Sequence, residues 1–267
     1  MRTGFHLRTA GDPARPPLVC LHGFLGTGED FAGLMPALAE RFHLLAPDLP
    51  GHGQSQLPAE AFTMAGCASM LVAWLADRVR GPALLYGYSM GGRLALYLAV
   101  HYPERFQAVA LESASPGLAD DCARASRRQR DEALAVRLEA EGTPAFVTDW
   151  YAQPLFQSLR SHSGFAALLA RRQRQSAAGL AASLRGMGTG SQPSLWSALS
   201  SLSLPAAAIV GEHDAKFREI ATQMAARRAG LEVRVIPGAG HNVHLEQGAA
   251  VAACLQAFFS QGRHQGT

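Results

Sequence analysis

Short apolar runs recur along the chain and alternate with longer segments of helical periodicity. Several runs are apolar throughout, which is typical of strands buried on both faces of a parallel sheet. The predicted strands are Leu18–Leu21, Leu44–Leu49, Ala83–Tyr88, Ala108–Glu112, Ala206–Val210 and Glu232–Ile236. The predicted helices are Phe31–Arg41, Thr63–Val79, Met90–His101, Lys216–Arg228 and Glu246–Phe259. This alternation predicts an α/β fold, with a mostly parallel central sheet flanked by helices.

The alternation stops between residues 117 and 202, where the pattern is helical and rich in arginine, and strand-like alternation resumes at Leu204. The aromatic residues of this stretch are Phe146, Trp150, Tyr151, Phe156, Phe165 and Trp196. We interpret residues 117–202 as a helical lid inserted into a core of residues 1–116 and 203–267, over the strand ends where α/β sheets bind ligands. The alternative is a set of helices that only pack around an aromatic core, and Trp196 is expected to be structural.

Composition and charge narrow the classes of partner. The chain has 267 residues, of which 48% are hydrophobic and 17% charged, so it can bury a sizeable core. The net charge of +3 is too small to indicate nucleic-acid binding. Residues 117–190 hold 10 arginines and 7 acidic residues, a net charge of +3. The whole chain, with 24 basic and 21 acidic residues, also has a net charge of +3, so its positive excess lies in this segment. Alone, that excess is more typical of a solvated basic helix face than of a binding site.

Targeting and metal signals are missing from the pattern. No apolar stretch is long enough to span a membrane, and the N-terminal segment lacks a signal-peptide core. Cys20, Cys67, Cys122 and Cys254 are far apart and form no CxxC pair, so no metal, cofactor or disulfide framework is expected. We expect a cytoplasmic protein with reduced thiols and neither a membrane nor a nucleic-acid partner, in an oligomeric state that stays open, a monomer included.

Residues 87–91 read Gly-Tyr-Ser-Met-Gly and match the pattern G-x-S-x-G. A predicted strand leads directly into this pattern and a predicted helix leads directly out, which is the context that the nucleophile elbow of α/β hydrolases requires. The turn is sharp and needs small neighbours, which Gly87, Gly91 and Gly92 supply. Ser89 would lie at a helix N-terminus, where developing negative charge is favoured. The pattern therefore predicts Ser89 as the reactive serine of an α/β-hydrolase fold.

A reactive serine needs a base, and the base needs an acid that orients it. In this fold the chain order is serine, acid, histidine. Asp214 follows one predicted strand and His241 follows the next, so both should lie at the sheet edge that carries Ser89. Glu112, at the end of the strand after the elbow, is a rival acid. His244 is a rival base, although it would sit at the start of the next helix.

An oxyanion hole for such a serine needs two backbone N–H groups. One should come from Met90, directly after the serine, and the other from Phe24 in the loop after the first predicted strand. His22, in the same loop, is expected to brace the loop. Asp48 is a further acid, but its place in the PDLPGHG turn favours a structural role.

From Leu18 to about Gln247 the chain resembles 2-succinyl-6-hydroxy-2,4-cyclohexadiene-1-carboxylate synthase (SHCHC synthase), the lyase of the menaquinone pathway. The matching stretches include LHGFLGTGEDF, PDLPGHG, GYSMGGRLALYLA, RRQR, DWYAQPLF, GEHDAKF and PGAGHNVHLE. The most specific features are Arg93 after the double glycine, the WY-x-QP-x-F block and the D-x-KF pattern. The stretches ESASPGL and ARRQRQSAAG depart from the family pattern.

The resemblance implies a small-molecule substrate with three carboxylates, 2-succinyl-5-enolpyruvyl-6-hydroxy-3-cyclohexene-1-carboxylate, from which pyruvate is eliminated. The substrate-binding residues that it implies are Arg93, Arg128, Arg171, Tyr88 and Trp150. Arg127, Arg172 and Arg174 are expected to be solvated or structural. For Tyr88 and Trp150, core packing is an equally open interpretation.

The resemblance also implies the mechanism. His241 would take the proton of Ser89, the alkoxide would remove a substrate C–H proton without forming an acyl-enzyme, and the N–H groups of Phe24 and Met90 would stabilise the enolate. Because the same groups could attack a carbonyl, a serine carboxylesterase or C–C hydrolase for an acidic substrate is the alternative enzyme. A ligand receptor that kept the fold is the alternative outside catalysis, and the intact triad argues against it.

Overall fold

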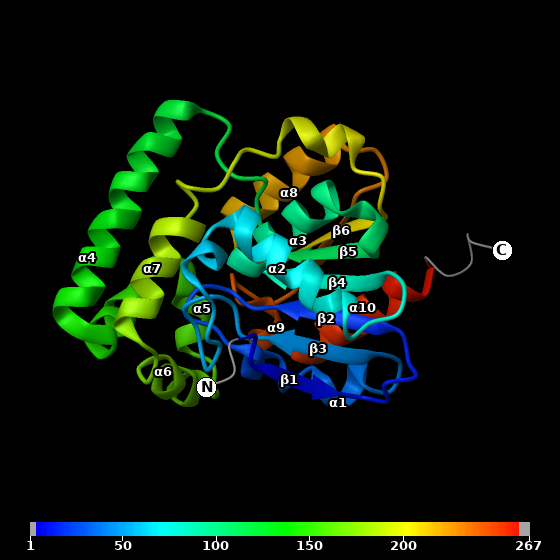
Figure 1. The fold of residues 1–267 in the computed structure, drawn as a ribbon, viewed down its shortest axis with the longest axis horizontal. Helices are drawn as coiled ribbons and strands as arrows, with labels where there is room; N and C mark the ends of the chain where they lie inside the picture. The colour runs from blue at the N-terminus through cyan, green and yellow to red at the C-terminus, as the bar shows by residue number, and fades with distance from the viewer. Residues whose placement is uncertain (1–3, 262–267) are drawn as a thin grey trace.

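The computed structural model describes residues 4–261 and contains a seven-stranded sheet with the order β1-β3-β2-β4-β5-β6-β7 (Figure 1). The strands are β1 (Leu7–Ala10), β2 (Pro17–Leu21), β3 (His43–Pro47), β4 (Ala83–Tyr88), β5 (Phe106–Glu112), β6 (Ala206–Gly211) and β7 (Glu232–Ile236). Only β1 pairs antiparallel, with β3, and every other neighbouring pair is parallel. The carboxyl ends of six strands therefore share one edge, as the predicted βαβ alternation requires.

Helices cover both faces of the sheet, and each face has its own apolar core. One core joins the sheet to α2 (Met64–Ala76), α3 (Met90–His101) and α8 (Ala215–Arg227). The other joins it to α1 (Met35–Leu38), α9 (Val243–Glu246) and α10 (Gly248–Gln261). Short 3-10 helices are η1 (Gly28–Phe31), η2 (Ala59–Phe62), η3 (Pro103–Arg105) and η5 (Ser197–Ser201). The fold class predicted from the sequence is confirmed.

Three elements differ from the sequence prediction. Strand β1 was missed because its four residues, Leu-Arg-Thr-Ala, form no apolar run. The predicted strand Leu44–Leu49 ends at Pro47, because Asp48 begins a turn in which its carboxylate accepts backbone hydrogen bonds. The predicted helix Phe31–Arg41 is broken into η1 and α1, and a proline in the first turn begins the second of these anew.

Between β5 and β6 the chain passes through residues 117–202, which we refer to as the insertion. It contains α4 (Asp121–Ala152), η4 (Pro154–Phe156), α5 (Gln157–Arg160), α6 (Phe165–Arg172) and α7 (Ala177–Met187). Gly142, with φ of 78°, divides α4 into two helices. A third apolar core lies between these helices and includes Leu25 from the loop after β2. Figure 1 shows the insertion at one end of the sheet.

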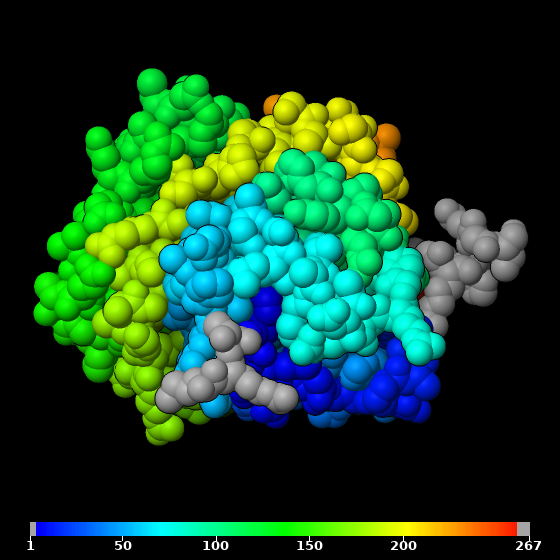
Figure 2. Space-filling view, in the orientation of Figure 1, coloured from blue at the N-terminus to red at the C-terminus, as the bar shows by residue number. Residues whose placement is uncertain are grey.

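The insertion packs directly on the core. Backbone atoms of Gly179, in α7, would collide with a Cβ on Gly51, and a Cβ on Gly186 would collide with the carbonyl of Phe62. In Figure 2 the yellow-green surface of α7 lies against the cyan surface of this core segment. Such close backbone approach requires glycine at these positions.

The described residues were also compared with the requirements of a metal site and of a membrane-spanning helix. Among residues 4–261 no group of three or more His, Cys, Asp or Glu side chains could hold a metal ion, and no helix is both long and apolar enough to cross a membrane. The four cysteines are free thiols, and Cys20 and Cys67 are fully buried, as their apolar surroundings predict.

Candidate active site

The loop between β4 and α3 forms a strained elbow with Ser89 at its tip. Ser89 has φ of 50° and ψ of −108°, a backbone conformation that costs energy for any residue with a side chain. Its N–H donates to the carbonyl of Glu112 at 2.8 Å. A Cβ on Gly87 would meet the carbonyl of Gly91, and a Cβ on Gly91 would meet that of Leu21. The glycines of G-x-S-x-G thus allow the sharp turn that presents the serine.

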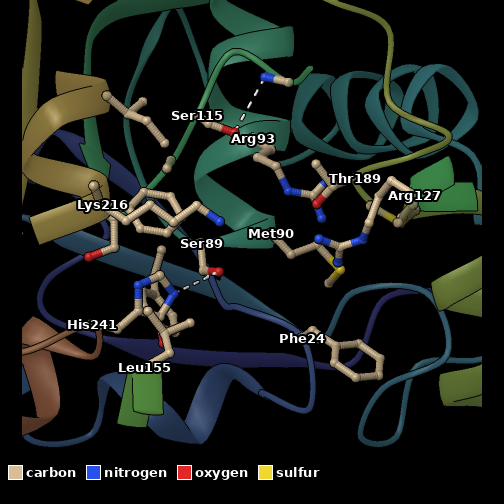
Figure 3. Close-up of a pocket in the computed structure, with 18 of the residues that line it drawn as sticks. Phe24, Ser89, Met90, Arg93, Ser115, Arg127, Leu155, Thr189, Lys216 and His241 are labelled. Carbon is tan, nitrogen blue, oxygen red and sulfur yellow. Dashed lines mark hydrogen bonds between the residues drawn. The ribbon is translucent and has the colours of Figure 1, made fainter. Parts of the chain in front are cut away.

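Asp214, His241 and Ser89 form a continuous chain of contacts. Nδ1 of His241 lies 2.7 Å from Oδ2 of Asp214, and Nε2 of His241 lies 3.3 Å from Oγ of Ser89 (Figure 3). Asp214 caps α8, where its Oδ1 accepts from the N–H of Phe217 at 3.2 Å. Both Asp214 and His241 are buried. The structure therefore brings together the three side chains that the sequence predicted, in the order that moves a proton from serine to histidine.

The two rival residues lie elsewhere and pair with each other. Nδ1 of His244 is 2.8 Å from Oε1 of Glu112, and both side chains are fully buried. No hydrogen bond joins either side chain to Ser89 within residues 4–261.

His22 and Asp48 hold loops in place. Nε2 of His22 accepts from the N–H of Leu49 at 2.8 Å, and burial lowers the pKa of His22, which favours the neutral acceptor. Asp48 accepts from the N–H groups of Gly28 at 2.8 Å and Gln54 at 2.9 Å. Both contacts are of the bracing kind that the sequence suggested.

A cavity of about 410 Å³ opens above Ser89, a size typical of small-molecule sites. Its lining comes from both the sheet edge and the insertion, and includes Phe24, Tyr88, Ser89, Met90, Arg93, Arg127, Trp150, Phe156, Thr189, Lys216 and His241. The backbone N–H groups of Phe24 and Met90 have no hydrogen-bond acceptor in the described residues. They are free to donate to a ligand.

Arg93 is a half-buried cation that lines this cavity. Its Nη1 donates to Oε1 of Gln192 at 2.8 Å, so a neutral amide and no carboxylate holds the guanidinium. Burial lowers the pKa of Arg93 to about 10, and the nearby charge of Arg127 adds to this. Arg93 still carries its charge at neutral pH. An unbalanced buried cation is a strong attractor for a ligand carboxylate.

Tyr88 and Trp150 both line the cavity, and both also pack. The Tyr88 ring centroid lies 5.5 Å from that of His241, and burial raises the pKa of Tyr88 well above its usual range, so it remains a neutral phenol. Trp150 stacks on Phe146 at 5.7 Å and meets Phe24 edge-on at 5.1 Å. Its stacking ties the insertion to the loop that carries the Phe24 N–H.

Comparisons with known proteins agree with this geometry. The model of the alpha/beta hydrolase fold family matches residues 16–247. A putative 2-succinyl-6-hydroxy-2,4-cyclohexadiene-1-carboxylate synthase of Bacillus subtilis is 38% identical over 248 residues, which cover 89% of this chain and 88% of that protein. The structure of MenH from S. aureus superposes with a TM-score of 0.92 at 31% identity, covering 98% of this chain and all of the other.

The chain belongs to the SHCHC synthase family of α/β hydrolases. The resemblance read from the sequence is confirmed. Protein PHYLLO of Arabidopsis thaliana is 33% identical over 264 residues, but this chain spans only 15% of that much longer protein.

Two of the arginines expected to bind the substrate of an SHCHC synthase do not line the cavity. Arg128 is exposed and donates to the carbonyl of Gly190 at 3.0 Å, whereas Arg127 lines the cavity beside Arg93 (Figure 3). Consecutive helical residues point about 100° apart, and here Arg127 is the one of the pair that faces the cavity. Arg171 points to Asp30, with Nη2 3.8 Å from Oδ1. Arg128 and Arg171 thus lie outside the lining of this cavity, and their role in substrate binding stays a prediction.

Lys216 is a cavity cation that the sequence prediction omitted. It lies two residues after Asp214, in the D-x-KF pattern, and its side chain points toward the cavity in Figure 3. It is also the only lysine in a chain with 24 basic residues. This rarity could have marked Lys216 in the sequence as a candidate site residue.

Proposed function

We propose that this chain eliminates pyruvate from 2-succinyl-5-enolpyruvyl-6-hydroxy-3-cyclohexene-1-carboxylate to give 2-succinyl-6-hydroxy-2,4-cyclohexadiene-1-carboxylate, and that Ser89, His241 and Asp214 drive the reaction. Lyase activity in menaquinone biosynthesis is the activity of the family to which the chain belongs. The observation that carries the proposal is that the Ser89–His241 contact opens into the cavity that holds Arg93, a cation with no carboxylate partner in the described residues.

Proton transfer begins the reaction. Asp214 holds the Nδ1–H of His241, so Nε2 is free to accept the proton of Ser89. The serine oxygen then removes the proton of the ring carbon that bears the succinyl group, which is α to the succinyl carbonyl. The resulting oxyanion accepts hydrogen bonds from the N–H groups of Phe24 and Met90. The electron pair returns to the ring, breaks the C–O bond to the enolpyruvyl group and expels pyruvate enolate.

The cavity cations hold the substrate. Arg93, Arg127 and Lys216 line the cavity around Ser89 and are the cations within reach of substrate carboxylates, although Arg127 is also paired with Asp131 at 2.7 Å. Residues 117–202 act as the lid, because Arg127 and Trp150 reach the cavity from α4. The reaction takes place in the cytoplasm, which suits four free thiols.

The test stops turnover with acid and measures the mass of the intact protein by mass spectrometry. Elimination without an acyl-enzyme predicts the unmodified mass at all times. The alternative, a serine carboxylesterase acting on an acidic ester, uses the same triad and predicts a covalent acyl group on Ser89. Accumulation of that adduct with the pathway substrate would overturn the proposed mechanism.

A further inference from the structure

A second buried histidine–carboxylate pair lies directly behind the Ser89–His241 contact. Glu112 and His244 are each fully buried, and Nδ1 of His244 is 2.8 Å from Oε1 of Glu112. The hydroxyl of Tyr86 donates to the other carboxylate oxygen of Glu112. Burial and the neighbouring carboxylate raise the pKa of Tyr86 well above its usual range, so the hydroxyl remains a donor. The mechanism proposed above gives this pair no task.

The pair connects the two loops that carry the reacting groups. The main-chain carbonyl of Glu112 accepts from the N–H of Ser89 at 2.8 Å, which fixes the elbow to β5. The Glu112 carboxylate accepts from the backbone N–H of His244 at 3.2 Å, at the start of the helix that follows the His241 loop. One residue thus anchors the elbow through its backbone and the histidine loop through its side chain.

Aromatic packing adds a second connection. The ring of Tyr88 lies against both histidines, with centroids 5.5 Å from His241 and 4.9 Å from His244. Phe31 packs on His244 with centroids 5.3 Å apart. His244 is therefore enclosed by rings, and a change in its position would be passed through Tyr88 to His241.

We propose that Glu112 and His244 form a positioning dyad that holds His241 within hydrogen-bonding reach of Ser89. The proposal rests on the role that the proposed function gives to Ser89. The 3.3 Å separation between Nε2 of His241 and Oγ of Ser89 is near the long end for a hydrogen bond. A small outward shift of the His241 loop would break it, and misplacement by about 1 Å can cost about 100-fold in rate.

The test compares His244→Leu with His244→Asn. Leucine removes the side-chain donor to Glu112, whereas the asparagine amide can place a donor close to the position of Nδ1. Leu75→Ala, which shortens a buried side chain in α2, controls for general destabilisation. Two rates are measured for each variant: pyruvate release from the pathway substrate, and covalent labelling of Ser89 by a fluorophosphonate, which needs no natural substrate.

The dyad predicts that His244→Leu lowers kcat and the labelling rate by about 10- to 100-fold with KM nearly unchanged. His244→Asn should recover most of both rates, and Leu75→Ala should lower only the melting temperature. Equal rates in His244→Leu and wild type would overturn the proposal, as would losses in both His244 variants no larger than in Leu75→Ala.

Where His244→Leu does not fold, Glu112→Gln replaces it. The uncharged amide weakens the contact with His244 Nδ1, so both rates should fall in the same direction. If wild type is labelled quickly yet releases no pyruvate, the proposed function fails, while the labelling series still decides the positioning role.

Discussion

Replacing Arg172 by methionine tests the buried ion pair that ties the insertion to the core. Arg172 is 1% exposed and Asp30 is 2% exposed, with Nη2 of the arginine 2.5 Å from Oδ2 of the aspartate. Nε of Arg172 also donates to the hydroxyl of Tyr151 at 3.2 Å. Methionine fills much of the same volume but leaves the Asp30 carboxylate buried without its partner.

The expected loss is large because desolvation of Asp30 is no longer offset. Breaking a buried pair by removing one partner costs about 3–5 kcal/mol in the free energy of unfolding. Burial alone would raise the pKa of Asp30, but the charge and hydrogen bond of Arg172 outweigh it and hold that pKa below its usual value. A depressed carboxyl pKa contributes stability at neutral pH, and this contribution is lost as pH falls through the folded-state pKa.

Urea unfolding at pH 7 and near pH 4 measures the effect. The difference between wild type and Arg172→Met should be largest at pH 7 and shrink in acid, because Asp30 takes up a proton more readily once it is left with only the more distant Arg171. Adding Asp30→Asn to Arg172→Met should recover much of the loss at pH 7. A loss below about 1 kcal/mol at pH 7, the scale of a surface ion pair, would refute this reasoning.

Five further substitutions test the site. Ser89→Ala and His241→Ala should each lower kcat by roughly 10³-fold or more with nearly unchanged melting temperature, and near-normal turnover in either would remove it from the triad. Arg127→Ala should raise KM about tenfold or more, because a charged hydrogen bond to a substrate carboxylate is lost. Arg128→Ala should leave KM near the wild-type value. A larger rise in KM for Arg128→Ala than for Arg127→Ala would contradict the assignment of Arg127 to the cavity. Gly91→Ala should lower the melting temperature and slow fluorophosphonate labelling of Ser89, because its Cβ would meet a carbonyl oxygen of β2; unchanged behaviour in both would show that the elbow tolerates a side chain.

The sheet and the triad could be predicted because local signals specify them. All six predicted strands match the structure to within two residues at each end. The positions of Ser89, Asp214 and His241 follow from parallel strands, whose carboxyl ends meet at one edge. Strand β1 left no comparable signal, because its four residues, Leu-Arg-Thr-Ala, hold two adjacent polar residues and form neither an apolar run nor a clear alternation.

The arginines of the insertion could not be assigned in the same way. Whether Arg127 or Arg128 faces the cavity depends on the rotation of α4, which is set by packing against α7 and by the break at Gly142. Of Arg171 and Arg172, Arg172 is the buried residue, because Asp30 in η1, which is distant in the sequence, provides its ion-pair partner. Composition placed the positive charge in the segment that reaches the cavity, but it could not show which of its arginines line the cavity.

The departures from the family pattern lie in the same region. Ser113, in ESASPGL, has φ of 47° and is fully buried, so a conformation that favours glycine is held by serine. Gln175, in ARRQRQSAAG, donates to the carbonyl of Leu25 and accepts from the N–H of Gly53 at 2.9 Å. The second departure thus supports the loops around the cavity.

A coupled assay tests the central claim most directly. The preceding pathway enzyme generates the labile cyclohexene substrate in place, and pyruvate release and diene absorbance are followed for wild type and Ser89→Ala. Hydrolysis of a panel of nitrophenyl esters is measured separately. We predict rapid pyruvate release that depends on Ser89, with poor ester turnover. Pyruvate release no faster than the uncatalysed background, together with rapid ester hydrolysis, would contradict the lyase assignment.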